Sequence, residues 1–188
     1  MKYKYQEEEA KHLFFTSDTH FYHKNIIEYA QRPFSSIENM NKELIKNWNS
    51  VVSSEDTVFH LGDIGFCGSE KLRGILSQLN GHIILVKGNH DSALKESFCN
   101  EMFEFHTNQL HLNIEGYSVY LNHYPFLCFS GDLQLFGHIH SNSANPTNDI
   151  DRFMLYGLPN QYDVGVDNNN YAPVSWLEIK NKLLNEGK

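Results

Sequence analysis

Five short clusters of polar residues each follow an apolar run in the sequence. They contain Asp, Asn and His, whose oxygen and nitrogen atoms bind divalent metal ions. In chain order the clusters are Asp18-Thr19-His20, Gly62-Asp63, Gly88-Asn89-His90-Asp91, His123 and Gly137-His138-Ile139-His140. The chain has 11 His among 188 residues, and imidazole is the commonest metal ligand of proteins. The pattern therefore indicates a metal site assembled from distant parts of the chain.

Two of the clusters carry metal-binding side chains two residues apart. In an extended backbone such side chains point to the same side, so Asp18 with His20, and His138 with His140, could each chelate one ion. Asp63 could act differently, because a carboxylate has two oxygens and can bridge two cations. Glycine before Asn89 and before His138 would permit tight turns or close approach of the backbone.

The apolar runs before the first three clusters have the length and composition of buried strands. They cover residues 13–17, 57–61 and 82–86. Helices are predicted between them, one over 35–52 with Ser35 and Glu38 as a capping box, and one from Ser69 to Asn80-Gly81. This alternation is typical of parallel strands joined by crossovers, and ligands bind at the carboxyl ends of such strands.

The pattern changes after Asp91. An antiparallel pair is predicted for residues 111–115 and 117–122 around Glu115-Gly116, and further strands for 133–136 and 162–166. Ser175 and Glu178 form another capping box, which predicts a closing helix with Leu177, Ile179, Leu183 and Leu184 on its apolar stripe. We expect an α/β (α+β) fold in one domain over residues 1–188, with a loosely ordered segment over 1–11.

Composition restricts the class of protein. The three cysteines, Cys67, Cys99 and Cys128, form no CxxC pair, and the chain has neither an apolar signal-peptide core nor a run of about 18 apolar residues. We therefore expect a cytoplasmic protein with no membrane partner. The formal net charge of −8 argues against a large basic surface for duplex nucleic acid, so a small substrate is favoured over nucleic acid. The sequence leaves the oligomeric state open.

The ordered clusters resemble the motifs of the calcineurin-like metallophosphoesterase superfamily, which are D-x-H, G-D, G-N-H-[DE], H and G-H-x-H. Here they read DTH, GD, GNHD, NHYP and GHIH between Asp18 and His140. Each motif alone is weak, but five in this order are specific. The resemblance, to small single-domain members of bacterial or phage type, implies a two-sheet β-sandwich flanked by helices.

The resemblance also implies a role for each motif residue. Two divalent metal ions would be bound, one by Asp18, His20 and His140, the other by Asn89, His123 and His138, with Asp63 bridging both. A hydroxide bridging the ions would attack phosphorus, and His90 would protonate the leaving alkoxide or stabilise the phosphoryl charge. Asn89, His90 and His23 would contact the substrate. We favour Mn²⁺ as the metal, ahead of Fe, Zn²⁺, Ni²⁺ and Mg²⁺.

The implied activity is hydrolysis of phosphomonoesters or phosphodiesters, with small nucleotides or cyclic nucleotides favoured as substrates. One alternative is a nuclease or nucleic-acid phosphatase, because related two-metal folds also cut nucleic acid. Another is a non-catalytic scaffold of the same fold that binds proteins, but His90 beside the complete ligand set argues against it. The only arginines are Arg32, Arg73 and Arg152, so the sequence indicates that metal ions, not guanidinium groups, neutralise the phosphate.

Phe66 departs from the family pattern, in which a second acidic residue three positions after the bridging Asp helps to orient the catalytic His. Asp91, Asp56 or a backbone carbonyl could orient His90 instead. His23 could contact the phosphate or support a metal ligand, or could only begin a helix.

Three further predictions concern residues outside the motifs. Tyr124-Pro125-Phe126 could stack on a nucleobase or only pack in its loop. His60 lies within a predicted buried strand, so it is predicted to be a hydrogen-bonded core residue. The apolar stripe of the helix over 35–52, including Trp48, is also predicted to belong to the core.

Overall fold

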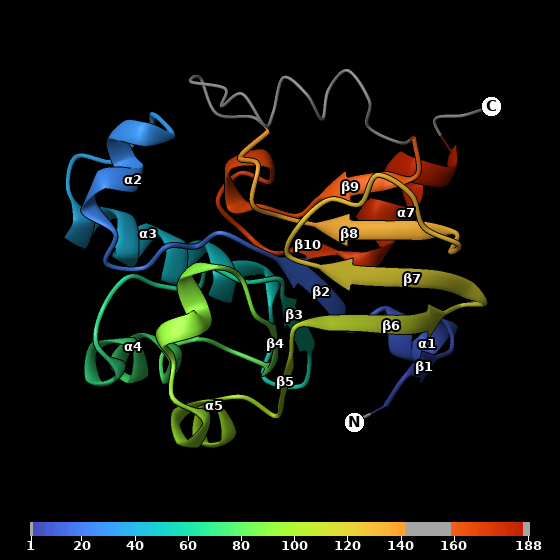
Figure 1. The fold of residues 1–188 in the computed structure, drawn as a ribbon, viewed down its shortest axis with the longest axis horizontal. Coiled ribbons are helices and arrows are strands. Elements are labelled where there is room, and N and C mark those ends of the chain that lie inside the picture. The colour runs from blue at the N-terminus through green and yellow to red at the C-terminus, as the bar shows by residue number, and fades with distance from the viewer. Residues whose placement is uncertain (1, 142–158, 186–188) are drawn as a thin grey trace.

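The computed structural model describes residues 2–141 and 159–185, and its strands form two mixed sheets (Figure 1). The first sheet has the order β10 (Val174–Ser175), β2 (Leu13–Thr16), β3 (Thr57–His60), β4 (His82–Val86) and β5 (Phe105–Thr107). The second has the order β1 (Lys4–Tyr5), β6 (Gln109–Ile114), β7 (Tyr117–Asn122), β8 (Leu133–Phe136) and β9 (Gln161–Asp163). The expected two-sheet architecture is confirmed.

Four strands of the first sheet run parallel, from β2 through β3 and β4 to β5, and β10 pairs antiparallel with β2. The register aligns Phe15 with Phe59 and Phe59 with Ile84, so β2, β3 and β4 end side by side. The three strands predicted before the first clusters are confirmed. Their carboxyl ends form one edge of the sheet, where loop residues far apart in sequence meet.

The uninterrupted apolar character of these strands follows from burial on both faces. Phe59 of β3 belongs to the core between the two sheets, where its ring stacks on Phe15 with the centroids 5.2 Å apart. The neighbouring Val58 points the other way, into a second core with Trp48 and Leu85. Burying one side chain of this kind contributes about 1.5–3 kcal/mol, so both faces stabilise the sheet.

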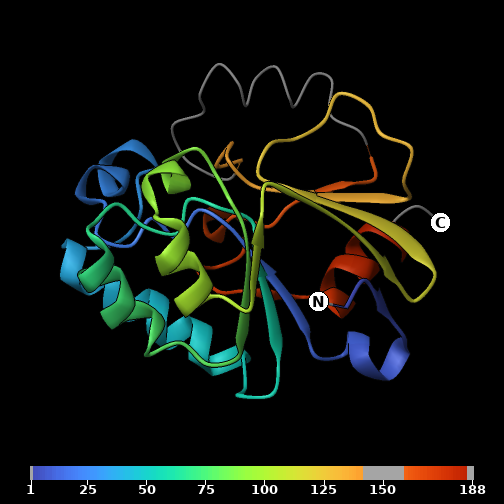
Figure 2. The same cartoon turned by 60° about the horizontal axis from the view of Figure 1, so that its bottom comes forward.

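Helices flank the sandwich on two sides (Figures 1 and 2). The second core joins the first sheet to α2 (Lys24–Tyr29), α3 (Ile37–Val51), α4 (Ser69–Leu76) and α5 (Glu96–Met102). At the opposite end lie α1 (Glu7–Ala10) and α7 (Trp176–Asn185), whose Trp176 and Ile179 enter the core between the sheets. The expected fold, two sheets flanked by helices, is therefore present.

Helix boundaries differ from the sequence predictions by one to several residues. The N-cap of α3 is Ser36 rather than Ser35, because the Ser36 hydroxyl accepts the Asn39 N–H at 3.2 Å. Helix α4 begins at Ser69, with Gly68 as its N-cap, and ends at Leu76, so Ser69 does not cap it. Met40, Leu44 and Trp48 of the predicted apolar stripe of α3 are buried in the core, as expected, whereas Val51 at the end of the helix is 42% exposed.

The predicted hairpin is confirmed, because β6 and β7 pair antiparallel around Glu115-Gly116. Both turn residues have positive φ, 52° and 90°, as a two-residue type I′ turn requires. The predicted strand over 162–166 is shorter, since β9 ends at Asp163 and the 3₁₀ turn η2 covers Val166–Asn168.

The two ends of the described chain also correct the predictions. Residues 1–11 were expected to be loosely ordered, whereas β1 pairs with β6 and Tyr5 packs into the core between the sheets. At the C-terminus the capping box is confirmed, because Ser175 and Glu178 exchange hydrogen bonds. Leu177 is 59% exposed and does not belong to the buried stripe. None of the helices within 2–141 and 159–185 has the length and apolarity needed to cross a membrane.

Candidate metal centre

Loops from both sheets converge to form the candidate site. Asp18, Asp63 and Asn89 lie shortly after β2, β3 and β4 of the first sheet, while His123 and His138 follow β7 and β8 of the second. Two groups of metal-binding residues result, one of Asp18, His20 and His140 and the other of Asp63, His123 and His138. In each group the ligand atoms lie within 4.8 Å of one another.

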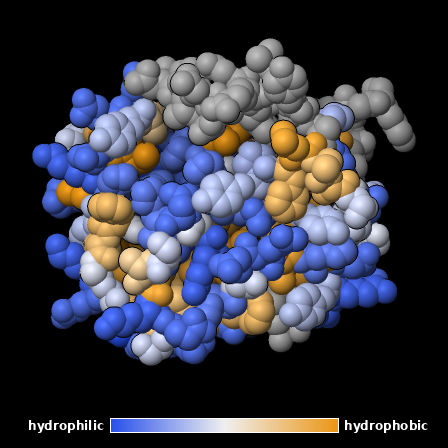
Figure 3. Space-filling view, viewed as in Figure 1, coloured by the Kyte–Doolittle hydropathy of each residue, from blue (hydrophilic) through white to orange (hydrophobic). Residues whose placement is uncertain are grey.

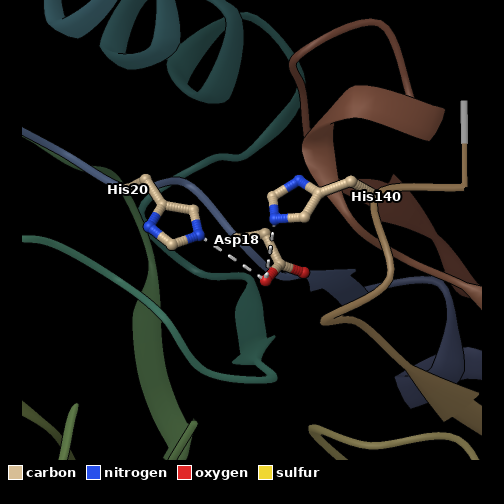
Figure 4. A group of neighbouring side chains, drawn as sticks. All are labelled: Asp18, His20 and His140. Atoms are coloured by element: carbon tan, nitrogen blue, oxygen red, sulfur yellow. Dashed lines mark ion pairs between the residues drawn. The ribbon is translucent and has the colours of Figure 1, made fainter. Parts of the chain in front are cut away.

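In the first group, two imidazole rings face one carboxylate oxygen (Figure 4). Nε2 of His20 lies 3.9 Å from Oδ1 of Asp18, and Nε2 of His140 lies 4.0 Å from the same oxygen. Two ligands that are each about 2.1 Å from an ion stand roughly 3 Å apart at a right angle and about 4.2 Å apart when opposite. The separations therefore suit one ion between the three side chains.

Two polar atoms of this group are buried and have no hydrogen-bond partner among residues 2–141 and 159–185. They are Oδ1 of Asp18 and Nε2 of His20, the same atoms that face each other. An unpaired buried polar atom is costly, so two adjacent ones indicate a missing ligand. Burial lowers the pKa of His20 well below its ordinary value, which keeps the ring in the neutral form that binds metals. A divalent cation fits these requirements.

The second group adds an amide oxygen to two imidazoles. Nε2 of His123 lies 3.2 Å from Nδ1 of His138 and 2.9 Å from Oδ1 of Asn89. Nδ1 of His123 donates to the Leu61 carbonyl at 2.8 Å, which holds the ring with Nε2 turned toward the group. Asn89 thus lies beside His123 of the second group.

Asp63 lies between the two groups. Its Oδ2 is 3.7 Å from Nε2 of His20 and 3.6 Å from Nε2 of His123. Its Oδ1 accepts the backbone N–H of His90 at 2.9 Å, which fixes the carboxylate and leaves Oδ2 facing both groups. Burial, with a smaller effect of the Asp18 charge, raises the Asp63 pKa to about 6, so a nearby cation would stabilise the ionised form.

The residues of both groups have an unusual backbone conformation. The angle φ is positive at Asp18 (57°), His20 (51°), Asp63 (56°), His138 (75°) and His140 (48°). Left-handed backbone at a non-glycine residue costs about 1–2 kcal/mol and is concentrated at functional sites. The explanation from extended backbone was therefore wrong, because the paired ligands converge through left-handed residues in loops.

Glycines of two motifs allow close approach of other backbone segments, as predicted. A Cβ at Gly88 would lie 2.7 Å from the Asp63 nitrogen and 2.9 Å from Cε1 of His123. A Cβ at Gly137 would lie 2.6 Å from Cβ of Ser17. These distances are too short for carbon, so glycine is needed at both positions for the loops to meet.

His90 lies at the solvent side of the site. Its Nε2 is 3.9 Å from Oδ2 of Asp63, and its side chain is 37% exposed. Asp91 does not orient it, because the Asp91 carboxylate accepts backbone N–H groups of Asp63, Ile64 and Gly88. Asp91 instead joins the loop after β3, which carries Asp63, to the loop after β4, which carries Gly88.

Asp56 does not orient His90 either, because its carboxylate binds His12 and Ser53 near the start of β3, away from the site. Phe66 stands at the sequence position of the family's second acidic residue. Its ring contacts His90 edge-on, with the centroids 5.5 Å apart.

The structure places three further residues named in the sequence predictions, which are His23, Tyr124 and His60. Nδ1 of His23 lies 3.2 Å from Nδ1 of His20, so His23 is placed to support that candidate ligand as well as to begin α2. The Tyr124 ring packs on His138 with centroids 4.6 Å apart, and its hydroxyl lies 3.5 Å from Oδ1 of Asn89. His60 is a fully buried core residue, as predicted, and its ring nitrogens bond to Thr19 and Gly62.

The sequence missed a buried pair that supports the first group. Asp167 lies 2.6 Å from Nδ1 of His140, and Arg32 binds the Asp167 carboxylate through two nitrogens at 2.8 Å each. Arg32 also donates to the carbonyls of Asp18 and Thr19. Burial opposes the charge on Asp167, but the bonds from His140 and the charge of Arg32 outweigh it and lower the pKa.

One signal could have found Asp167, because the residue directly follows the strand predicted over 162–166, but it belongs to none of the five motifs. For Arg32 the sequence predicts only that guanidinium groups do not neutralise the phosphate. Its fully buried guanidinium indeed faces Asp167 rather than the metal groups.

Known proteins resemble this chain in sequence. The sequence profile of the calcineurin-like phosphoesterase superfamily domain matches residues 12–157. The uncharacterized protein MJ1445 of Methanocaldococcus jannaschii is 38% identical over 183 residues, which is 94% of this chain and 93% of that protein. The Gene 66 protein of Mycobacterium phage L5 is 41% identical over 81 residues, covering 41% of this chain and 38% of that protein.

A solved structure shares the fold. The protein of unknown function AQ665 from Aquifex aeolicus superposes with a TM-score of 0.72 at 27% sequence identity. The match covers 89% of this chain and 97% of the Aquifex chain.

Proposed function

The chain belongs to the calcineurin-like phosphoesterase superfamily, and on this premise we propose that it is a metal-dependent hydrolase of phosphate esters. The substrates proposed are small phosphomonoesters or phosphodiesters, with nucleotides or cyclic nucleotides first. The cofactors proposed are two divalent ions, with Mn²⁺ first. The observation that carries the proposal is the position of Asp63, whose Oδ2 stands about equally far from His20 and His123.

Each proposed ion has a complete set of protein ligands. Asp18, His20 and His140 would hold one ion, and Asn89, His123 and His138 the other, with Asp63 shared. Two such ions lower the pKa of water and neutralise phosphate oxygens during hydrolysis. Carboxylate, amide and imidazole ligands together suit Mn²⁺ as well as Fe and Zn²⁺.

Both carboxylates are held in the same way. One oxygen of each accepts a backbone N–H from a neighbouring loop, that of His138 for Asp18 and that of His90 for Asp63. The other oxygen faces the site. The carboxylates are therefore oriented before any ligand binds, which is how preorganised sites avoid the cost of reorganisation.

His90 is proposed as the residue that protonates the leaving oxygen. It lies beside Asp63 and is exposed enough to reach a substrate, with 37% of its side chain accessible. A general acid must lie within hydrogen-bond reach of the oxygen that it protonates. Asn89 is proposed to contact a phosphate oxygen from the same loop.

The charge distribution favours a small substrate over a polymer. The formal net charge is −8. Arg32 is committed to Asp167, and Arg73 pairs with Glu101 at the surface, so neither is free to clamp a phosphate. Arg152 lies outside the described residues. Nucleic acid binding usually relies on many Lys and Arg contacts to phosphate groups, and Arg32 and Arg73 do not supply such contacts.

The test is hydrolysis of p-nitrophenyl phosphate and bis(p-nitrophenyl) phosphate by protein stripped of metal and resupplied with Mn²⁺, Mg²⁺, Zn²⁺ or Ni²⁺. Turnover with at least one metal is expected, and Asp63→Asn should lower it by at least about 100-fold. Glu55→Gln is the matched control, because Glu55 is an exposed acid outside the site. Absence of turnover with every metal, or full activity in Asp63→Asn, would overturn the proposal.

A further inference from the structure

Phe66 is an exposed aromatic residue next to the metal centre. Its side chain follows Asp63 by three positions and remains 55% exposed. The backbone around it is fixed, because its N–H donates to the Phe21 carbonyl at 2.8 Å and Gly65 forms a bridge with Phe21. The ring therefore has a defined position at the rim of the site, because hydrogen bonds hold the backbone that carries it.

Phe66 is part of a group of rings. It stacks on His23 with centroids 4.6 Å apart and an interplanar angle of 26°, and meets His90 edge-on. Tyr29, itself 61% exposed, meets His23 edge-on at 6.4 Å. An exposed group of large aromatic side chains beside a polar site points to a binding role, whereas a single exposed one would not.

Phe66 also lines a cavity whose other lining residues are not members of the two metal-binding groups. Its volume is about 530 Å³, and its lining includes Tyr22, Ile37, Glu38, Phe66, Glu70 and Lys71. A volume of this size can hold a small organic molecule. Figure 3 shows apolar side chains reaching the surface on this side of the molecule, between the places of α2 and α4 in Figure 1.

The position of His90 indicates which part of a substrate would enter this cavity. His90 touches Phe66 on one side, and its Nε2 lies 3.9 Å from Asp63 on the other. If His90 protonates the leaving oxygen, the alcohol attached to that oxygen must lie on the His90 side. It would then extend toward Phe66.

We propose that Phe66 and this cavity bind the alcohol part of the ester, and that this part carries a nucleobase. The inference rests on the proposed function, since it assumes that the phosphate lies at the metal centre. Every nucleobase has a flat face that stacks on an aromatic ring. Glu38, Glu70 and Lys71 supply acceptors and a donor for the polar edge of a base. Phe66 is thus a specificity-determining residue in place of the acid found in relatives of the superfamily.

The experiment compares two ligands that differ only in the base. They are the phosphonate analogues of adenosine 5′-monophosphate and of ribose 5-phosphate, in which a CH₂ group replaces the ester oxygen so that neither is hydrolysed. Calorimetry in the presence of Mn²⁺ measures their dissociation constants for the full chain. The variants are Phe66→Leu, which keeps apolar volume without a ring, and Phe66→Tyr, which keeps the ring. Tyr3→Leu is the control, because Tyr3 is 52% exposed and lies at the N-terminal strand.

The wild-type protein should bind the adenosine analogue at least about ten-fold more tightly, as expected for one stacked base. Phe66→Leu should remove most of this preference without weakening the ribose analogue, while Phe66→Tyr and Tyr3→Leu should keep it. Equal affinity of both analogues for the wild type would overturn the inference. So would an equal loss for both in Phe66→Leu, because that result would make Phe66 only a support for His23 and His90.

The two proposals can fail separately. A protein that hydrolyses the chromogenic esters but shows no preference for the base retains the proposed function and loses this inference. A protein with no turnover under any metal loses the proposed function, and the calorimetric comparison still reports whether Phe66 binds a base.

Discussion

Asp167 lies 2.6 Å from Nδ1 of His140 and holds that ring with Nε2 turned toward Asp18. The same carboxylate is bound by Nε and Nη2 of Arg32. Nη2 also donates to the carbonyl of Asp18, and Nη1 donates to that of Thr19. One buried pair thus fixes two of the three residues proposed to hold the first ion. Partners of this kind, behind the ligands themselves, commonly change metal affinity by 10- to 100-fold.

We predict that Asp167→Asn weakens metal binding at the first group by about 10- to 100-fold, because His140 loses its charged partner and Arg32 its counter-ion. Calorimetric titration of the metal-free protein with Mn²⁺ measures this loss directly. Glu101→Gln is the matched control, since Glu101 also pairs with an arginine but at the surface. An affinity unchanged from wild type would show that Asp167 has only a structural role.

The second prediction concerns Gly88, which touches the Asp63 loop. Gly88→Ala should destabilise the protein by about 1–3 kcal/mol, because the new Cβ would overlap the Asp63 backbone. It should also weaken metal binding, since the displaced carboxylate is the one shared by both ions. The control is Gly74→Ala, in α4 with open space around it, which should stabilise by about 0.5–1 kcal/mol. Chemical denaturation of both variants measures these changes, and a stable Gly88→Ala with normal metal affinity would contradict the argument.

His60 should make stability depend on pH. Burial lowers its pKa from 6.5 to about 3. Above pH 6.5 the ring is neutral in both folded and unfolded chains, so it adds no pH dependence. Between pH 6.5 and 3 only the unfolded chain binds the proton, so this residue makes the free energy of unfolding fall as pH falls, by up to about 1.4 kcal/mol per unit.

The variant His60→Gln removes the imidazole that binds this proton in the unfolded chain. We expect it to be less stable than wild type at pH 7.5, because the bonds with Thr19 and Gly62 are disturbed, but to lose less stability on acidification to pH 5. Denaturant unfolding of both metal-free proteins across this range compares the two slopes. The effects of other titrating groups cancel in the comparison, so parallel slopes would refute the role given to His60.

The positions of the candidate metal ligands could be predicted from the sequence, because the motifs follow predicted strands. Asp18, Asp63 and Asn89 follow apolar runs long enough to be strands, and parallel strands bring their carboxyl ends together. The local geometry could not be predicted in this way. Asp18 and His20 converge through left-handed backbone, which is stabilised by contacts such as that from the Asp18 N–H to the carbonyl of Gly62, 44 positions away in the sequence.

Residues that act through tertiary contacts were harder to find. Arg32 and Asp167 are separated by 135 positions, and neither stands in a motif, so only the fold shows that they meet. Asp91 was one candidate to orient His90, but it joins the Asp63 loop to Gly88 through three backbone hydrogen bonds that no sequence pattern reveals. The departure at Phe66 was visible in the sequence, but its stacking on His23 was not.

Counting the metal ions bound per chain tests the central claim most directly. Metal-free protein is titrated with Mn²⁺ while bound metal and hydrolysis of bis(p-nitrophenyl) phosphate are followed together. We predict that wild type binds two ions, that activity needs both, and that Asp63→Asn loses activity and binds at least one ion more weakly. Activity that is complete with one ion, or an Asp63→Asn variant that keeps both ions and full turnover, would contradict a site built around a shared Asp63.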